Sequence, residues 1–326
     1  MHPPACLLAG RYFIRVPQRY EITRRDALSR MSVGMAALAG ASSMTRAAVQ
    51  TAPIVTRRIP SSGKVIPVIG LGTWQTFDVG SSAAARAQRE EVLSAFIELG
   101  GRVIDSSPMY GSSEEVVGDL IAKLGVRSQV FLATKVWTSG KARGIQQMQE
   151  SMRKLRTRSV DLMQVHNLVD VRTHVSTLRE WKRDGRIRYI GMTHYTAGFH
   201  DDIARLIELV PVDFIQINYS VAEREAEQRL LPLARERDVA VIANRPFAAG
   251  TLLRELSGRP LPDWASEIEC TSWAQLLLKF VVSHPAITCA IPATSRVEHL
   301  RDNMRAGSRP LPNEELRARI AAAAAI

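Results

Sequence analysis

Residues 103–118 read VIDSSPMYGSSEEVVG, and this stretch decides the fold. Val103 and Ile104 lead into Asp105, so a short β-branched run ends in a charged residue, as a buried strand does at its end. A loop that contains Tyr110 follows, and the apolar residues of 114–124 then fall on one side of a helix. The order strand, loop, helix predicts one unit of an α/β fold.

The same unit recurs on both sides of this stretch. Short apolar runs predict eight strands, at Val68–Gly72, Val103–Asp105, Val130–Lys135, Val160–His166, Tyr189–Met192, Phe214–Asn218, Val239–Asn244 and Thr288–Ile291. Helical periodicity predicts eight helices, at Glu90–Leu99, Glu114–Leu124, Gly144–Leu155, His174–Asp184, Asp201–Leu209, Glu223–Arg237, Ser272–Ser283 and Val297–Arg305. Eight strands that are each followed by a helix predict a closed parallel (β/α)8 TIM barrel of the α/β class.

An open, doubly wound sheet is the alternative fold, and it requires a glycine-rich phosphate turn directly after its first strand. Gly70 and Gly72 are present, but Thr73-Trp74-Gln75 follows, with no third glycine and no immediate helix. Before the first strand, Arg57–Pro60 and Lys64–Pro67 flank a Ser-Ser-Gly turn, which predicts a β-hairpin. We expect this N-terminal hairpin to lie at the barrel floor.

The chain is predicted to hold a leader at residues 1–50, the barrel at 55–310 and a C-terminal tail at 311–326. The leader pairs Arg24 with Arg25 ahead of a weakly apolar stretch, which is typical of a twin-arginine export signal. That stretch is too short and too rich in small residues for stable membrane insertion. The pattern predicts a periplasmic protein that uses the export machinery. A disordered basic tail on a cytoplasmic protein is the alternative.

The net charge of +11 raises the question of a nucleic-acid partner. Residues 1–47 hold seven arginines against two acids, so nearly half of this charge lies in the leader. The remaining charge is spread among acidic residues, and no nucleic-acid-binding motif is present. We therefore favour a solvated mixed surface and predict no nucleic-acid partner.

Three cysteines, Cys6, Cys270 and Cys289, give neither a disulfide framework nor a metal-ligand set. One bridge between Cys270 and Cys289 is an alternative to two buried free thiols. Free thiols are favoured because Cys289 lies in the apolar run Ala286–Ile291. No metal site is predicted.

Reactive residues of an α/β barrel belong at the carboxyl ends of its strands. Asp105, Lys135 and His166 close three successive predicted strands, and Tyr110 follows Asp105 in the next loop. Each residue alone has an ordinary structural explanation, but together they suggest one site at the barrel mouth.

The four residues together suit the reduction of a carbonyl group. Hydride addition leaves an alkoxide, which needs a proton and electrostatic support. Tyr110 can supply the proton, and an ammonium at Lys135 would lower the pKa of the phenol, which is near ~10 in water. Asp105 would fix the lysine and keep it charged, and His166 would hydrogen-bond the substrate oxygen.

Five motifs then identify a resemblance that runs from about Arg58 to Asn303. They are VIGLGTW at 68–74, VIDSSPMYGSSEEVVG at 103–118, LATKVW at 132–137, DLMQVHN at 161–167 and IPATSRVEHLRDN at 291–303. The chain resembles the aldo-keto reductase superfamily. The resemblance implies NADPH lying extended across the barrel mouth, without a Rossmann domain, and direct hydride transfer to an aldehyde or ketone.

The resemblance also implies roles for individual residues. Tyr110 is the general acid, Lys135 and Asp105 tune it, and His166 positions the carbonyl. The implied cofactor-binding residues are Gly72, Thr73, Trp74, Asn167, Thr193, His194, Gln216, Asn244, Arg245, Thr294, Ser295, Arg296, His299 and Asn303.

Five positions depart from the family pattern. Thr193 and His194 stand where the family has a Ser-Asn pair, and Asn244 stands where a tyrosine often stacks on the nicotinamide. Ala293 and His299 replace a frequent lysine and arginine at the phosphate-binding end. Thr294, Ser295 and Arg296 remain to hold the 2′-phosphate, and Arg296 is the only certain cation among these three, so NADPH is preferred and NADH stays the alternative.

Trp74, Met109 and Trp137 lie beside the motif residues and predict an apolar, aromatic pocket for a small or medium carbonyl compound. Ordinary packing at the barrel rim is the alternative for these three. The alternative function is a cofactor-binding barrel that acts as a sensor or regulatory subunit with little turnover. All four predicted catalytic residues are intact, which favours the enzyme.

Overall fold

The structure is a computed structural model, and it describes residues 53–325. The predicted leader at 1–50 lies outside the described residues, and so does Cys6. The other two cysteines, Cys270 and Cys289, are buried and free, as the apolar context predicted.

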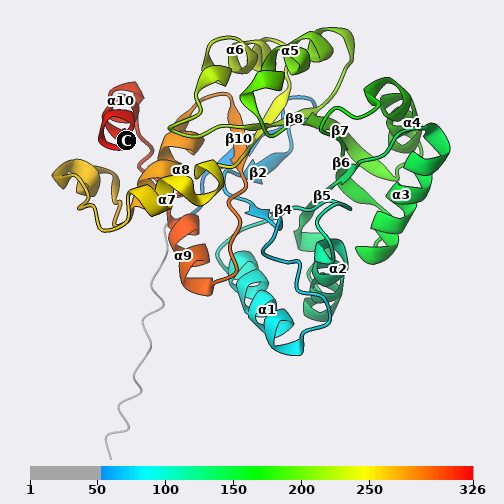
Figure 1. The fold of residues 1–326 in the computed structure, drawn as a ribbon, viewed down its shortest axis with the longest axis horizontal. Helices are drawn as coiled ribbons and strands as arrows, with labels where there is room; N and C mark the ends of the chain where they lie inside the picture. The colour runs from blue at the N-terminus through cyan, green and yellow to red at the C-terminus, as the bar shows by residue number, and fades with distance from the viewer. Residues whose placement is uncertain (1–52, 326) are drawn as a thin grey trace, which may run out of the picture. The chain divides into compact units, whose positions relative to one another are not determined.

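One eight-stranded parallel sheet forms the centre of the fold (Figure 1). Its strands are β3 (Leu71–Gly72), β4 (Val103–Asp105), β5 (Phe131–Val136), β6 (Val160–His166), β7 (Ile187–Thr193), β8 (Phe214–Asn218), β9 (Ala240–Asn244) and β10 (Ile287–Ala290). They pair in chain order from β3 to β10. Parallel bridges from Ile69 to Ala290 and from Gly72 to Ala293 join the two ends of this order. The sheet is therefore closed, and the predicted barrel is confirmed.

Helices surround the strands (Figure 1). They are α1 (Ala83–Glu98), α2 (Ser113–Leu124), α3 (Lys141–Lys154), α4 (Val171–Arg183), α5 (His200–Leu209), α6 (Leu230–Glu236), α7 (Thr251–Glu255), α8 (Trp273–Ser283), α9 (Val297–Arg305) and α10 (Glu314–Ala323). Short 3-10 turns lie at Arg127–Gln129, Ala197–Phe199, Glu225–Glu227, Ala248–Gly250 and Asp263–Ile268. The helices bury their apolar faces against a core that runs around the outside of the barrel.

The N-terminal hairpin consists of β1 (Thr56–Arg58) and β2 (Val65–Pro67), which pair antiparallel. Ile59 and Ile66 belong to the apolar cluster inside the barrel, and both are buried. Their partners include Val103 and Phe214, the first residues of β4 and β8. The hairpin therefore closes the end of the barrel at which the strands begin, and the expected position at the floor is confirmed.

Two helix predictions were wrong in extent. The first helix starts at Ala83 instead of Glu90, because Ser82 caps it and accepts a hydrogen bond from the Ala85 backbone N–H. The alanine-rich first turns favour a helix without any apolar periodicity, so the pattern missed them. The predicted helix Glu223–Arg237 is a 3-10 turn followed by α6. Pro232 cannot donate a backbone hydrogen bond, and it is tolerated in the first turn of a helix that starts at Leu230.

The segment predicted as a C-terminal tail contains α10. Arg317 on this helix donates hydrogen bonds to the Tyr219 hydroxyl at 2.8 Å and to the Glu227 carboxylate at 2.9 Å. Its guanidinium also lies over the Phe280 ring, 4.2 Å from the centroid. Arg317 therefore joins α10 to the β8–α6 loop region and to α8.

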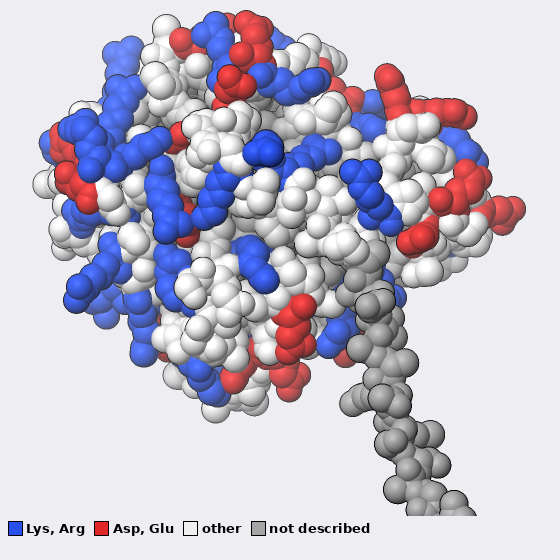
Figure 2. Space-filling model, turned by 180° about the vertical axis from the view of Figure 1, so that it is seen from behind, with Lys and Arg blue, Asp and Glu red and all other residues white. Residues whose placement is uncertain are grey.

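Lys and Arg side chains outnumber Asp and Glu on the face shown in Figure 2. Part of the positive charge of the barrel is neutralised locally, because Lys64, Arg127 and Arg188 all lie within 4 Å of the buried Asp161 carboxylate. Within residues 53–325, no helix has the length and apolar character needed to cross a membrane.

Candidate active site

The four residues predicted as catalytic lie at one end of the barrel. Asp105 and His166 are the last residues of β4 and β6, and Lys135 is next to last in β5. Tyr110 lies in the loop between β4 and α2. Parallel strands bring their carboxyl ends to the same edge, so these side chains meet at the barrel mouth.

Asp105 and Lys135 form a buried ion pair. The Lys135 Nζ lies 2.5 Å from the Asp105 Oδ2 and donates a second hydrogen bond to the Ser106 carbonyl at 2.8 Å. Lys135 is 0% exposed and Asp105 is 2% exposed. Burial alone would lower the pKa of Lys135, but the Asp105 carboxylate and the Tyr110 phenol outweigh it and raise this pKa above its usual value. The lysine is therefore an ammonium at neutral pH.

Two glutamines, neither predicted to act on Asp105, hold its carboxylate. Gln216 and Gln164 donate amide hydrogen bonds to Asp105 Oδ1 at 2.8 Å and 3.1 Å. The other end of Gln216 accepts a hydrogen bond from the Thr193 hydroxyl at 3.3 Å. Gln216 was predicted to hold the nicotinamide carboxamide, and both ends of its amide contact protein groups in this structure. A signal for Gln164 existed, because it precedes His166 by two residues in a strand and so points to the same side.

Tyr110 lies against both Lys135 and His166. The Lys135 Nζ is 4.9 Å from the centre of the Tyr110 ring, and the His166 ring meets that ring edge-on with centroids 5.9 Å apart. Burial raises the pKa of Tyr110 above its usual value, and the Lys135 ammonium opposes that rise without cancelling it. The sequence analysis foresaw the effect of the lysine but not the larger effect of burial. The phenol therefore keeps its proton at neutral pH.

His166 is a neutral imidazole. Burial, the Lys135 ammonium and His194 lower its pKa from 6.5 to about 2. Its Nδ1 is 3.0 Å from the hydroxyl of the buried Ser107, which the sequence analysis did not single out. Trp137 contacts the same imidazole edge-on, with ring centroids 6.4 Å apart.

Several predicted cofactor residues carry polar atoms that have no partner among the described residues. Asn167 and Asn244 each bury an unpartnered Oδ1, and Arg245 buries an unpartnered Nε. Asn167 and Arg245 adopt left-handed backbone conformations, with φ of 51° and 50°. Buried polar groups without partners are costly in a folded protein. This side of the mouth is therefore suited to a polar ligand.

His194 lies in a stack of aromatic rings, between Tyr195 and Phe199. Its Nδ1 accepts hydrogen bonds from the Thr196 backbone N–H at 3.3 Å and is 3.1 Å from the Thr196 hydroxyl. Burial lowers the pKa of His194, with His200 adding to the effect. Because Nδ1 accepts, the proton of this neutral ring is on Nε2, and His194 can donate a hydrogen bond from that atom.

The motif at 291–303 lies beside β3, the first strand of the barrel, and this close approach requires a glycine at position 72. A Cβ at Gly72 would come within 2.7 Å of the Ile291 carbonyl oxygen. Thr294 and Asn303 are buried, whereas Arg296 is exposed and its Nε is 3.5 Å from the Glu298 carboxylate. His299 is exposed, and Ser295 is partly buried. These residues lie before or within α9, whose N-terminus can hold an anion.

A second cation lies next to this motif, and the sequence analysis missed it. Arg89 on α1 donates hydrogen bonds to the Thr76 carbonyl at 2.5 Å and to the Ser295 carbonyl at 3.4 Å. Arg89 thus joins the loop after β3 to the loop before α9. Thr73 faces the interior, and its hydroxyl lies 3.0 Å from both the Asp105 carbonyl and the Ser106 hydroxyl.

The three predicted substrate residues are exposed. Trp74 is 48%, Met109 39% and Trp137 43% exposed. Tyr195 and Phe199 are exposed to a similar degree. Large apolar side chains left in contact with water beside a polar cluster are typical of a site that binds an apolar group.

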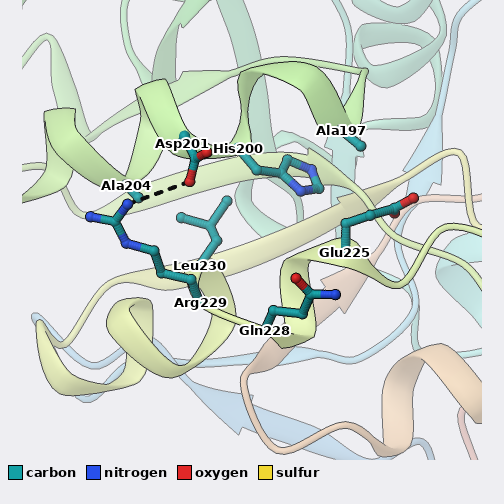
Figure 3. A pocket seen from close by; sticks show the side chains of 8 residues that line it. All are labelled: Ala197, His200, Asp201, Ala204, Glu225, Gln228, Arg229 and Leu230. Atoms are coloured by element: carbon teal, nitrogen blue, oxygen red, sulfur yellow. Dashed lines mark hydrogen bonds and ion pairs between the residues drawn. The ribbon is translucent and has the colours of Figure 1, made fainter.

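A small pocket lies between the start of α5 and the turn before α6 (Figure 3). Its volume is about 140 Å³, and none of its lining residues was predicted as a site residue. His200 borders it and is hydrogen-bonded to Asn218 at 3.0 Å. The pocket is too small for a dinucleotide, which needs a site several times larger.

Comparison with known proteins identifies the family and agrees with the barrel fold. The model of the aldo/keto reductase family matches residues 68–324. Methylglyoxal reductase YeaE of Escherichia coli is 31% identical over 255 residues, which covers 76% of this chain and 88% of that protein. The chain belongs to the aldo/keto reductase family.

Solved structures of other aldo/keto reductases share the fold. An aldo-keto reductase from Klebsiella pneumoniae in complex with NADPH is 31% identical, with a TM-score of 0.68, covering 82% of this chain and 94% of that chain. The holo form of AKR11C1 from Bacillus halodurans is 23% identical with the same TM-score, and it supports the fold alone. The family assignment makes this protein an oxidoreductase.

The residues at the mouth of this aldo/keto reductase fit a nicotinamide dinucleotide. The unpartnered amide oxygens of Asn167 and Asn244 can accept hydrogen bonds, and the unpartnered Arg245 Nε can donate one. The segment Thr294–Arg296 and the N-terminus of α9 can receive a phosphate. NADP(H) has a carboxamide, which can both donate and accept hydrogen bonds, and it has phosphates that such a helix N-terminus can receive.

Proposed function

We propose that this protein reduces an aldehyde or ketone to an alcohol with NADPH, and that Tyr110 is the general acid. The observation that carries the proposal is the Asp105–Lys135 pair lying against Tyr110 and His166 at an open barrel mouth. Dinucleotide, when bound, supplies a hydride to the carbonyl carbon. The protein must then protonate the oxygen and stabilise its developing charge.

Tyr110 is suited to deliver that proton. Its raised pKa keeps the phenol protonated at neutral pH, so a proton is available. When the proton moves from the phenol to the substrate oxygen, a phenolate forms beside the Lys135 ammonium, which stabilises it. Asp105 holds this ammonium, and Gln164 and Gln216 hold Asp105. The charge that appears in the transition state therefore meets a fixed cation.

His166 is suited to orient the carbonyl. The imidazole is neutral because its pKa lies near 2, so it acts as a hydrogen-bond donor and not as a proton donor. Trp137 lies edge-on to this imidazole, and Trp74 and Met109 are exposed apolar side chains in the loops after β3 and β4. They support a small or medium carbonyl compound with an apolar substituent.

The preference for NADPH rests on the last motif. Arg296 is 63% exposed, and it precedes α9 beside the buried Thr294. Both can contact a 2′-phosphate, together with Ser295. The related Klebsiella pneumoniae structure, which is described as a complex with NADPH, supports the same choice.

A panel of aldehydes, ketones and quinones tests the proposal, with NADPH oxidation followed by absorbance. We expect turnover by the wild type and a loss of about 10²–10⁴-fold in kcat for Tyr110→Phe, with NADPH binding preserved. If the wild type binds NADPH but consumes it with no carbonyl compound, the sensor or regulatory function replaces the enzyme.

We further propose that residues 1–50 direct export by the twin-arginine route, with the cofactor loaded before transport of the folded protein. The support is the sequence pattern around Arg24 and Arg25. Fractionation and N-terminal sequencing test this: we expect periplasmic protein that is cleaved near Ala47 and holds NADP(H). Cytoplasmic protein with an intact N-terminus would refute it.

A further inference from the structure

The hydroxyl of Ser107 is the hydrogen-bond partner of His166 Nδ1, at 3.0 Å. Ser107 is 0% exposed, and it follows Asp105 by two residues in the loop that carries Tyr110. The same hydroxyl accepts a hydrogen bond from the Met109 backbone N–H at 3.4 Å. These two contacts determine where the hydroxyl proton can go.

The proton of the Ser107 hydroxyl has one acceptor among the described residues. The hydrogen-bond partners of this oxygen among residues 53–325 are His166 Nδ1 and the Met109 N–H, and the Met109 N–H can only donate. If the hydroxyl donates to Nδ1, every buried group at this point is satisfied. If Nδ1 carried the proton instead, Nδ1 would donate to the Ser107 oxygen. The proton of the buried Ser107 hydroxyl would then have no acceptor, which is costly.

The other ring nitrogen of His166 faces a different environment. No side chain or backbone group of residues 53–325 hydrogen-bonds Nε2, and this atom is not among the buried polar atoms that lack a partner, so it is open to the mouth. The Tyr110 and Trp137 rings flank the imidazole at the mouth. Nε2 is thus the ring atom left for a substrate.

We propose that Ser107 is a positioning residue that fixes the tautomer of His166, so that Nε2 carries the proton and donates to the substrate carbonyl oxygen. The donation from Nε2 to the substrate carbonyl oxygen rests on the proposed function. A neutral imidazole holds one proton on either nitrogen, and the partner of one nitrogen decides the state of the other. In the opposite tautomer the Nε2 lone pair would face the carbonyl oxygen and repel it.

The first test is the ¹⁵N spectrum of histidine-labelled full-length protein, because protonated and unprotonated imidazole nitrogens have distinct shifts. The chain has seven histidines, so the His166 signals are assigned by their absence in His166→Asn. We expect an unprotonated Nδ1 and a protonated Nε2 at pH 7. A protonated Nδ1 in the wild type would overturn the proposal without any activity measurement.

The second test compares three serine variants in the same spectrum and in steady-state kinetics. Ser107→Ala should shift the Nδ1 signal toward a mixture of tautomers and lower kcat roughly tenfold, with KM for NADPH unchanged. This loss is a fraction of the about 10²–10³-fold effect of removing a whole oxyanion donor. Ser107→Thr keeps the hydroxyl and should restore both readouts. Ser151→Ala removes another buried serine hydroxyl, far along the chain on α3, and should change neither.

A fall in kcat for Ser107→Ala with an unchanged His166 spectrum would overturn the proposal, since the serine would then act through packing. If Ser107→Thr does not fold, the wild-type and Ser107→Ala spectra still decide. A wild type that shows protonated Nε2 but reduces no carbonyl compound would overturn the proposed function, while the spectrum would still support the tautomer assignment.

Discussion

The barrel mouth has two sides that are built differently. The predicted catalytic residues Asp105, Tyr110, Lys135 and His166, called the catalytic cluster below, have their charged atoms bonded within the protein: Asp105 alone receives hydrogen bonds from Lys135, Gln164 and Gln216. The predicted cofactor residues Asn167, His194, Asn244, Arg245 and Thr294–Arg296, called the cofactor rim below, include buried amide and guanidinium atoms that have no partner among the described residues.

This difference follows from which elements supply the residues. Three members of the catalytic cluster lie within strands, whose positions the sheet fixes, so their geometry exists before any ligand binds. The cofactor rim comes mainly from loops, two of whose residues have left-handed φ. We infer that the cluster is preorganised, and that the rim reaches full hydrogen bonding only with dinucleotide bound. Substitutions in the cluster should therefore affect stability and turnover together, and substitutions in the rim should affect cofactor binding alone.

The largest effect is expected for Lys135→Met. It leaves the Asp105 carboxylate buried without its cation, which should lower the free energy of unfolding by about 3–5 kcal/mol. It also removes the cation beside Tyr110, so kcat should fall by about 10³-fold. Urea unfolding and NADPH oxidation measure the two losses.

The double variant Asp105→Asn, Lys135→Met is the control for Lys135→Met. The double variant has no unpaired carboxylate at position 105, so it should recover part of the free energy of unfolding and none of the activity. If the single variant unfolds at the same urea concentration as the wild type, the pair contributes no preorganisation, and the distinction between the two sides fails.

The next effect concerns His166 and pH. Its pKa is about 2 in the folded protein against 6.5 as the ordinary value, so the unfolded chain binds more protons between these limits. Stability from the neutral ring is therefore complete above about pH 6.5 and is lost as the pH falls toward 2. From pH 7 to pH 5, the wild type should lose about 2 kcal/mol more than His166→Asn.

Urea unfolding of both proteins at the two pH values measures this difference. His284, whose pKa burial and Arg317 lower to about 4, is present in both proteins and cancels in the comparison. Equal losses in the two proteins would show that His166 is not held neutral by its surroundings.

The catalytic cluster was predictable from sequence for a physical reason. A polar residue that ends a β-branched run is a local pattern, and a closed barrel brings three such ends together. Asp105, Lys135 and His166 could therefore be placed without knowing any contact. Gln164 carried the same kind of signal through its two-residue spacing from His166, but a buried glutamine in a strand needs a partner that the sequence does not name.

The contacts around the rim were less predictable, because they join segments that are distant in the chain. Arg89 hydrogen-bonds Ser295 across 206 positions, and nothing in the local sequence of α1 marks it. The rise in the pKa of Tyr110 was not predicted, for a related reason. The burial of Tyr110 depends on all the residues around the mouth, whereas the opposing effect of Lys135 depends on the single pair Tyr110 and Lys135. The early start of α1 shows a local failure, since alanines form a helix without an apolar pattern.

A smaller effect is expected at the exposed end of the cofactor rim. Arg296→Ala should weaken NADPH binding about tenfold, or ~1.4 kcal/mol, and leave NADH binding unchanged, because only NADPH carries the 2′-phosphate. The exposed arginine makes this difference sensitive to salt. Fluorescence titration with both dinucleotides at two ionic strengths measures it, and an equal loss for both would assign Arg296 to another part of the cofactor.

The smallest effect comes from two asparagines that sit side by side. Asn218 and Asn244 are the last residues of β8 and β9 and face each other in the sheet register. Asn218 is bonded at both ends, to His200 at 3.0 Å and to Glu223 at 3.2 Å. Asn244 donates to the His194 carbonyl at 3.3 Å, and its Oδ1 has no partner among residues 53–325.

Asn244→Ala should therefore weaken NADPH binding about three- to tenfold, the worth of one neutral hydrogen bond, with kcat at saturating NADPH unchanged. Asn218→Ala should instead lower the free energy of unfolding by at least about 1 kcal/mol, because the His200 ring and the Glu223 carboxylate would lose a hydrogen-bond partner inside the protein. The dissociation constant for NADPH should stay unchanged. Binding titration and urea unfolding on both variants separate the two effects. If Asn244→Ala destabilises the protein and binds NADPH normally, its free oxygen is not a cofactor contact, and the boundary between the two sides of the mouth lies closer to Arg245.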